Sequence, residues 1–385
     1  MKSITVYYGP KIGFEKLIPT NRKTLSELVA EHDAKNKVYT HKIKRDDEES
    51  EDAPTPVEKE FVENLVAYSE SYAGITESAV QSFVRILSGY IVENIYLQNP
   101  PVQIRQQLEQ TFPGIIKVKR YSYKNLTEKG FHEINNTFDD NIIGQQHVKE
   151  RLLIALYPLL SNVNSRKPVV IMFYGNSGIG KTETAKYISK ILKQPLFRKQ
   201  LSMFHSGEFQ GYLFGGTHHQ GSFARDLLER ESNVILLDEF DKPHPVFHSA
   251  FYQLFDEGLF EDKNYRVELY NSIIICTSNY QTEAEIRQNL GDPIYYRFDK
   301  FIKFENLSET AMKAIISKHI ESRYKALSRQ EKKIVDKNYI QMKLFANVSR
   351  LNNVRQISNI IEEYFGIQLV KSFLGKQNKG EQPDE

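Results

Sequence analysis

The feature that most constrains this chain is a glycine-rich turn at residues 175–182, which reads Gly-Asn-Ser-Gly-Ile-Gly-Lys-Thr. It follows an apolar, β-branched run at 169–174 and precedes a segment at 183–192 with helical spacing. This is the G-x-x-x-x-G-K-[ST] pattern, in the strand, loop and helix context that a phosphate-binding loop requires. An ordinary glycine turn is the alternative, and the strand and helix on either side argue against it.

Each position of this loop has a predicted role in binding a nucleoside triphosphate. The glycines let backbone N–H groups close around the phosphates at a helix N-terminus. Lys181 reaches the β- and γ-phosphates, and the Thr182 hydroxyl ligates Mg²⁺. We therefore expect ATP and Mg²⁺ as ligands, bound in this loop by Gly175, Asn176, Ser177, Gly178, Ile179, Gly180, Lys181 and Thr182.

Two further apolar runs, at 234–237 and 273–276, end in polar residues. Because the carboxyl ends of parallel strands share one edge of a sheet, their polar ends are expected beside the phosphate loop. Asp238 would hold Mg²⁺ through water, Glu239 would polarise the attacking water, and Asn279 would orient it. Each of these ends would be an ordinary polar turn if it stood alone.

The order and spacing of these segments resemble the second ATPase module of Clp-type AAA+ unfoldases. The Asp-Glu strand is followed by Lys-Pro-His-Pro at 242–245, by Leu-Phe-Asp-Glu-Gly at 254–258 and by Thr-Ser-Asn at 277–279. Ile-Ile-Gly-Gln at 142–145 resembles the family's entry motif, in which Ile143 would contact adenine. The resemblance covers residues 140–375.

This resemblance implies an α/β fold. The expected AAA+ P-loop NTPase module has a parallel five-stranded sheet flanked by helices over 140–306, followed by a small helical lid over 307–375. Arg297 would be the arginine finger of a neighbouring subunit's site, and Arg355 the sensor arginine of the lid, although it stands in Asn-Val-Arg where the family usually has Gly-Ala-Arg.

The segment at 211–219, Gly-Tyr-Leu-Phe-Gly-Gly-Thr-His-His, resembles the Gly-Tyr-Val-Gly pore loop that grips a translocating polypeptide, with one residue more. Tyr212 is the first candidate for the gripping residue and Phe214 the second. A merely structural glycine-rich loop is the alternative.

Residues 1–135 form an N-terminal region in which we find no chemical motif. A charged, proline-punctuated linker is expected at about 44–57. The spacing of Phe61, Leu65 and Tyr68, and of apolar residues at 80–87, predicts helices, with possible strands at 4–8 and 114–119. A mainly helical α+β region is therefore expected here, and a polar tail at 376–385.

Composition argues against several other classes of protein. The formal net charge is only +2 and no basic stripe with interleaved aromatic residues occurs, so no nucleic-acid partner is expected. No apolar stretch approaches the roughly 18 residues of a membrane span, and no signal-peptide core is found. Cys276 is the single cysteine. We expect a cytoplasmic protein without a membrane partner.

The leading hypothesis is an ATPase that remodels or unfolds protein substrates as a ring, a homo-hexamer by the resemblance, with a pore aromatic gripping the chain. Protease-partnered relatives carry an Ile-Gly-Phe-type loop between the sensor strand and the arginine finger, and only residues 280–296 fill that interval here, so no docked peptidase is expected. A nucleotide-switched assembly or recruitment ATPase acting on one dedicated partner is the second hypothesis. A nucleic-acid motor is the third.

Overall fold

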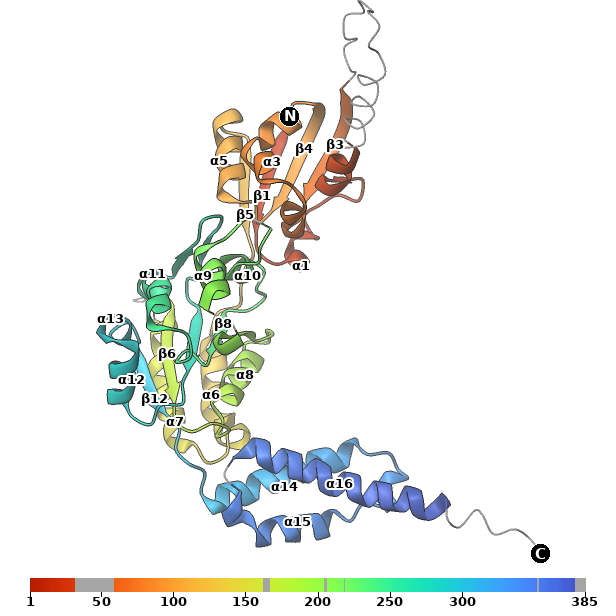
Figure 1. Ribbon diagram of the computed structural model, residues 1–385, viewed down its shortest axis with the longest axis vertical. Coiled ribbons are helices and arrows are strands. Elements are labelled where there is room, and N and C mark those ends of the chain that lie inside the picture. Colours follow the sequence, from red (N-terminus) through yellow and green to blue (C-terminus); the bar gives the residue numbers. More distant parts are fainter. Residues whose placement is uncertain (32–58, 162–166, 204–205, 218, 352, 378–385) are drawn as a thin grey trace, which may run out of the picture.

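Two parallel sheets and a helical bundle are stacked along the long axis of the molecule in the computed structural model (Figure 1). The structure describes residues 1–31, 59–161, 167–203, 206–217, 219–351 and 353–377. The expected linker at 44–57 and the tail beyond residue 377 lie outside these residues. No helix in the described ranges is both long and apolar enough to cross a membrane.

The central sheet is parallel and five-stranded, in the order β12-β6-β11-β8-β7. Its strands are β6 Val169–Tyr174, β7 Phe197–Gln200, β8 Val234–Asp238, β11 Ile273–Thr277 and β12 Lys300–Lys303. The three inner strands are buried along their whole length because helices cover both faces, which explains their unbroken apolar sequences. The α/β class and the five-stranded parallel sheet are confirmed.

Helices cover the two faces of this sheet in separate layers. The side chains of Ile171, Leu236 and Ile275 pack against α6 Glu128–Asn141, α7 Gln146–Leu156 and α8 Lys181–Ile191. Val170, Leu237 and Ile274, one residue away on the same strands, face the other layer. That layer holds α9 Ser206–Phe214, α10 Phe223–Leu228, α11 Tyr252–Glu257, α12 Glu283–Leu290 and α13 Asp292–Tyr295. An antiparallel hairpin, β9 Leu259–Glu261 and β10 Arg266–Glu268, adjoins it.

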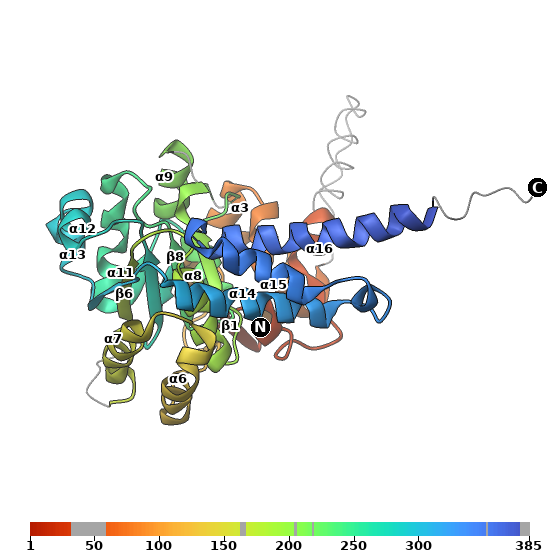
Figure 2. The ribbon, with the colours of Figure 1, turned by 90° about the horizontal axis from the view of Figure 1, so that it is seen from below.

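The carboxy-terminal part is a bundle of three helices, α14 Glu309–Ala326, α15 Lys337–Ala346 and α16 Val354–Gln377. Ser308 and Asp336 cap the first two helices by accepting the backbone N–H groups of Ala311 and Tyr339. Ile316, Ile340 and Phe365 contribute to a core separate from that of the sheet. From below, α16 is seen to run alongside α14 and extend beyond it (Figure 2).

The N-terminal region contains a second parallel sheet of five strands, in the order β2-β3-β4-β1-β5. The strands are β1 Ser3–Tyr8, β2 Lys23–Thr24, β3 Glu60–Ala67, β4 Tyr90–Gln98 and β5 Ile116–Arg120. Short helices accompany them: α1 Lys11–Phe14, α3 Glu77–Gln81, α4 Phe83–Leu87, α5 Val102–Thr111 and the 3₁₀ turn η1 Ser69–Gly74. Counted within each sheet, both sheets have the order fifth, first, fourth, third, second.

The expectation of a mainly helical N-terminal region is therefore wrong in its strand content. Phe61 and Leu65, which suggested a helical face, lie in β3, and a second central strand covers residues 90–98. The carboxyl half of β3 is buried on both sides, so the two-residue alternation that identifies a strand is lost. The helices at 80–87 and the strands near 4–8 and 114–119 are present.

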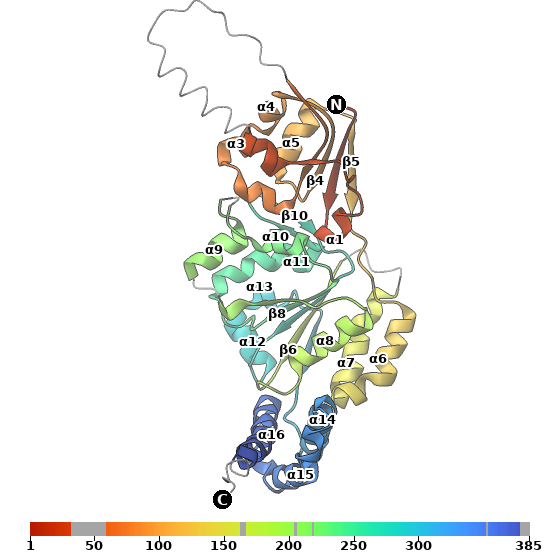
Figure 3. The same ribbon diagram turned by 90° about the vertical axis from the view of Figure 1, so that its right-hand side faces the viewer.

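The N-terminal sheet rests with its carboxyl edge on the central module (Figure 3). Glu229, which caps α10, accepts hydrogen bonds from Asn99 at 2.9 Å and from Gln98 at 3.2 Å, just after and at the end of β4. Burial raises the pKa of this carboxyl group. A backbone hydrogen bond also joins the N-terminal region to the central module, from the Val102 N–H to the Asn264 carbonyl.

Candidate nucleotide-binding site

The phosphate loop, residues 175–182, connects β6 to α8 through backbone conformations that only glycine adopts readily. Gly175, Gly178 and Gly180 have φ angles of 122°, 75° and 115°. A Cβ on Gly175 would lie 2.4 Å from the carbonyl oxygen of Phe304, just after β12. Gly175 is therefore required by close packing as well as by its φ angle, and the loop opens onto the first turn of α8, where backbone N–H groups favour anions.

Lys181 begins α8 with its ammonium group shielded from water. The side chain is buried, and Nζ donates to the carbonyl oxygens of Gly175 at 2.5 Å and Asn176 at 2.8 Å, and to Asn279 Oδ1 at 3.2 Å. Burial lowers the pKa of Lys181 to about 8, against the opposing effect of nearby carboxylates. The group is thus a partly desolvated cation beside the loop, which suits a phosphate.

Asp238 lies at the carboxyl end of β8, close to a residue that the sequence did not identify. Its carboxylate accepts from Thr277 Oγ1 at 2.5 Å and from Arg198 Nε at 3.0 Å. Arg198 lies on the edge strand β7 and forms an ion pair with this carboxylate. Thr182 and Asp238 line the same cavity, and two protein oxygens completed by phosphate oxygens and water are a set that Mg²⁺ accepts. These residues fit the metal.

Glu239 follows β8 in a left-handed conformation with φ 56°. Its carboxylate accepts from Gln200 Nε2 at 3.1 Å and from the Ser202 hydroxyl, and its N–H donates to Thr277 Oγ1 at 2.9 Å. Gln200 and Ser202 were also missed. The two-residue spacing of Arg198 and Gln200 was the available signal, since side chains two apart on a strand share a face.

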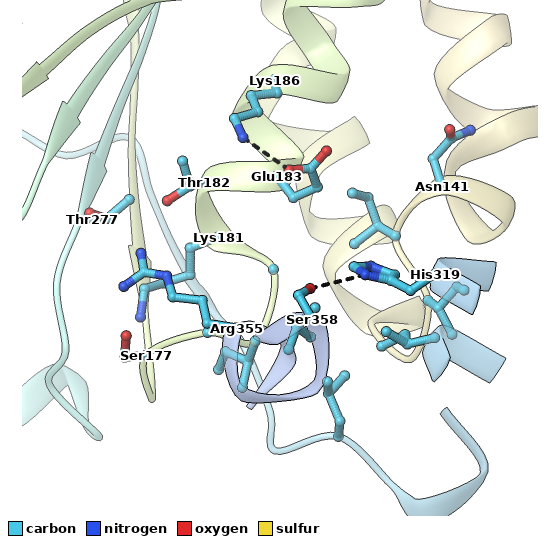
Figure 4. Close-up of a pocket in the computed structure, with 18 of the residues that line it drawn as sticks. Asn141, Ser177, Lys181, Thr182, Glu183, Lys186, Thr277, His319, Arg355 and Ser358 are labelled. Atoms are coloured by element: carbon cyan, nitrogen blue, oxygen red, sulfur yellow. Dashed lines mark hydrogen bonds and ion pairs between the residues drawn. The ribbon is translucent and has the colours of Figure 1, made fainter. Parts of the chain in front are cut away.

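The lid and the sheet edge enclose one cavity of about 960 Å³. From the module it is lined by the phosphate loop from Ser177 to Thr182 and by Ile143, Asp238, Glu239 and Asn279. From the lid it is lined by Lys318, His319, Arg323, Arg355 and Ser358. Figure 4 shows Arg355 reaching toward Lys181, with Ser358 and His319 hydrogen-bonded beside it at 3.0 Å. Most of the predicted nucleotide-binding residues thus converge here.

The lid is attached directly to the phosphate loop. The Val354 N–H donates to the Gly178 carbonyl at 3.0 Å, and a Cβ on Gly178 would lie 2.7 Å from the Cβ of Asn353. On the other side, the buried Gln145 donates to the carbonyl oxygens of Ile179 at 3.2 Å and Glu305 at 2.8 Å. Gln145 thus ties the loop to the segment that leads into the lid.

Arg297 is placed away from its own chain's cavity. Its Nε donates to Asp256 at 2.7 Å, its guanidinium lies 4.2 Å from the ring centroid of Tyr252, and NH1 donates to the Pro293 carbonyl. These contacts hold it at the outer end of α11 and α13. The part of Arg297 in catalysis therefore stays a prediction.

Tyr212 and Phe214 lie in α9, so the loop expected at 211–219 is wrong for its first four residues, which are helical. Tyr212 is 9% exposed and its hydroxyl donates to Asp226 at 2.6 Å, whereas Phe214 is 44% exposed. The hydroxyl's burial beside that carboxylate raises the pKa of Tyr212. Tyr212, the first candidate, is therefore buried, and Phe214, the second, is exposed at the surface.

Comparison with known proteins agrees with this geometry. A family model described as AAA domain (Cdc48 subfamily) matches residues 166–340, and one described as Torsin matches residues 116–213. AAA+ ATPase ClpV1 of Pseudomonas aeruginosa is 33% identical over 164 residues, which are 40% of this chain and 18% of that protein. The mitochondrial disaggregase of Homo sapiens is 32% identical over 228 residues, 51% of this chain and 32% of that protein.

Chaperone protein ClpB of Malacoplasma penetrans is 25% identical over 317 residues, covering 74% of this chain and 44% of that protein. The chain thus spans less than half the length of these relatives. A cryo-EM structure of Hsp104 in a closed state, with ATPγS and casein, matches 97% of this chain and 89% of that one, with a TM-score of 0.55 and 15% identity. That likeness concerns the fold alone.

Strand order, phosphate loop and the paired carboxylates after β8 define a P-loop ATPase module of the AAA+ class. Within that class the module is similar to Clp-type proteins, in agreement with the resemblance seen in the sequence.

Proposed function

We propose that the module binds ATP with Mg²⁺, hydrolyses it, and uses the cycle to remodel protein substrates. The observation that carries this proposal is the convergence of Lys181, Asp238, Glu239 and Asn279 on one cavity that the lid closes with Arg355. A cation, two carboxylates and an amide at the end of a parallel sheet are the groups that phosphoryl transfer to water requires.

Each side chain has a distinct part in this proposal. Lys181 binds the β- and γ-phosphates, Asn279 orients water near the γ-phosphate, and Glu239 accepts its proton. Mg²⁺, held by Thr182 and Asp238, would neutralise charge on the phosphate oxygens. Ile143 lies against the adenine and Arg355 senses the nucleotide from the lid. Because the Glu239 carboxylate is hydrogen-bonded to Gln200 at the end of β7 and to Ser202 in the turn after it, these hydrogen bonds must break before it can activate water.

We place the complete site between two copies of the chain. Arg297 is turned away from its own cavity and held by Asp256, so it is available to a neighbouring subunit. An arginine supplied in trans links hydrolysis to a head-to-tail contact, and such contacts close into rings. The proposed assembly is a homo-hexamer.

The proposed substrates are protein chains, gripped by an aromatic residue at the ring's pore. The relatives' names, chaperone and disaggregase, support this class of substrate. Phe214 is the better gripping residue, because it is exposed at the end of α9 while Tyr212 is hydrogen-bonded inside. Residues 280–296 are filled by α12 and α13, so we propose no peptidase partner.

One observation favours the dedicated switch as a second candidate. The loop after α9 contacts the N-terminal region, where a His219 ring nitrogen lies 2.6 Å from the Ala73 carbonyl oxygen. Glu229, at the end of α10, is bound by the same region. Changes at the nucleotide site could thus be passed to the N-terminal sheet without threading.

The test uses Glu239→Gln, which should bind ATP yet hydrolyse it about a hundredfold or more slowly, because the general base is lost. Glu150→Gln, an exposed residue of α7, is the matched control and should keep the wild-type rate. Steady-state phosphate release and equilibrium ATP binding give the two readouts. A Glu239→Gln protein that hydrolyses at the wild-type rate would contradict the assigned role.

The trapped protein then separates the two candidate functions. With ATP, fluorescein-labelled casein should bind Glu239→Gln and give a higher fluorescence anisotropy, and Phe214→Ala in the same background should release it. ATP-dependent casein binding that ignores Phe214 argues against the proposed grip. Intact hydrolysis in the wild type, without casein binding in the trapped form, favours the dedicated switch.

A further inference from the structure

A second cavity, of about 500 Å³, lies where the N-terminal sheet meets the module. From the sheet it is lined by Gly9 and Tyr121, which directly follow β1 and β5, and by Pro100, two residues after the end of β4. β1 lies between β4 and β5 in the sheet. The connection after β1 runs toward the β2 edge, whereas the connection after β4 crosses β1 to reach β5, so the two connections diverge beside β1. In parallel α/β sheets, ligands bind outside the carboxyl ends of the strands at this point.

Arg230 supplies the strongest sign of a ligand in this cavity. Its side chain is buried, and among the residues that the structure describes it donates only to the carbonyl oxygens of Leu227 at 2.7 Å and Glu268 at 3.3 Å. Nε has no hydrogen-bond partner, and across the described ranges no carboxylate forms an ion pair with Arg230. A buried guanidinium without a counter-charge is costly, and an anion in the cavity would offset that cost.

The other groups of the cavity suit the same anion. Arg120 lies at its edge with a 55% exposed side chain, a long contact of 3.4 Å to Glu268 and its guanidinium 5.8 Å from the ring centroid of Tyr8. Arg230, whose pKa burial lowers to about 10, remains charged at neutral pH.

Aromatic rings complete the lining. Tyr8, Tyr121 and Tyr123 lie along the cavity, and the Tyr123 ring is stacked 4.0 Å from the Arg230 guanidinium. Tyrosine faces accept planar groups as well as cations. The volume falls within the range of roughly 300–1,000 Å³ that small-molecule sites have.

We propose that this cavity binds a nucleoside phosphate, with its phosphates on Arg230 and Arg120 and its base among the tyrosines. The turn after β1 does not take the phosphates itself. It lacks the Gly-Lys-Thr ending, α1 has only four residues, and a Cβ on Gly13 would overlap the Tyr7 hydroxyl, so the space above it is filled. The N-terminal region thus has the strand order of the motor and a different anion site.

The test uses Lys181→Ala, which disables the motor site, in the full chain. Binding of ADP and AMP is measured by isothermal titration calorimetry without Mg²⁺. We expect one remaining site for each nucleotide. Arg120→Gln should weaken it roughly tenfold, the usual effect of losing a hydrogen bond to a charged group. Arg85→Gln, an exposed residue of α4 outside the cavity, is the matched control and should leave it unchanged.

Arg230→Met separates a binding role from a structural one. Because it removes a buried unpaired charge with little change in volume, the variant should unfold at a similar or higher denaturant concentration while losing ADP and AMP binding. Lower stability with unchanged nucleotide affinity would overturn the proposal. So would the absence of any ADP or AMP binding in Lys181→Ala. Wild-type ATP hydrolysis is measured separately, so failure here leaves the motor assignment intact.

Discussion

Lys181 is a cation held where water is largely excluded, and its behaviour follows from that placement. Burial favours the neutral amine, while Asp241 and Asp238 favour the ammonium form; burial is the larger effect and lowers the pKa to about 8. Between about pH 8 and the unfolded value of 10.5, the unfolded chain therefore binds more protons than the native one. Over this window Lys181 makes the free protein more stable as pH rises.

The affinity for ATP should change with pH in the opposite direction to stability, because the phosphates bind the ammonium form of Lys181. The Mg²⁺-dependent affinity of Glu239→Gln for ATP should fall about tenfold between pH 7 and pH 9, as the protonated fraction of Lys181 in the free protein drops. Titration calorimetry at several pH values measures this. Lys181→Arg in the same background stays charged and should show a flatter profile. A pH-independent affinity with Lys181 in place would argue against a phosphate contact.

At the scale of elements, α9 places its aromatic residues Tyr212 and Phe214 in different environments. Positions 212 and 214 differ by about 200° around a helix of 3.6 residues per turn. Tyr212 therefore faces the core, where it packs near Phe223 and donates to Asp226, while Phe214 faces solvent.

Tyr212→Phe should lower the free energy of unfolding by about 1–2 kcal/mol, since it removes a hydrogen bond to a carboxylate that keeps Lys199 as a partner. Phe214→Ala should leave stability within about 0.5 kcal/mol, as exposed substitutions usually do. Urea unfolding measures both. Casein binding to the trapped form should show the reverse order, with Phe214→Ala impaired and Tyr212→Phe retained. Equal losses of stability in Tyr212→Phe and Phe214→Ala would contradict the assignment of a structural role to Tyr212 and a surface role to Phe214.

At the scale of the whole molecule, the proposed role of Arg297 in a neighbouring subunit's site would make catalysis a property of the assembly. Arg297→Ala should hydrolyse ATP far more slowly than wild type, because its sites receive no arginine from the neighbour. Mixed with Glu239→Gln, it should regain part of its activity, since a Glu239→Gln subunit still offers Arg297 to the intact site beside it. Phosphate release from the mixture, against each variant alone, measures this. A mixture no more active than its components would contradict the shared site.

The sequence by itself determined the local chemistry of the module. A phosphate loop consists of consecutive residues, and buried parallel strands give unbroken apolar runs. Lys181, Asp238, Glu239 and Asn279 could therefore be identified as candidates, and the α/β class was predicted correctly. Their convergence followed from one rule, that parallel strands present their carboxyl ends at one edge.

Only the tertiary structure decided what depends on contacts between distant segments. Arg198 and Gln200 contact Asp238 and Glu239 because β7 pairs with β8. That pairing joins strands distant in the sequence and cannot be read from a local pattern. In the N-terminal sheet β3 was missed, because its carboxyl half is buried on both faces and loses its period of two. The burial of Tyr212, the exposure of Phe214 and the position of Arg230, whose Nε has no partner among the described residues, depend on which face each element turns toward its neighbours. Packing settles that orientation, because burial depends on the partner surface as well as on the residue.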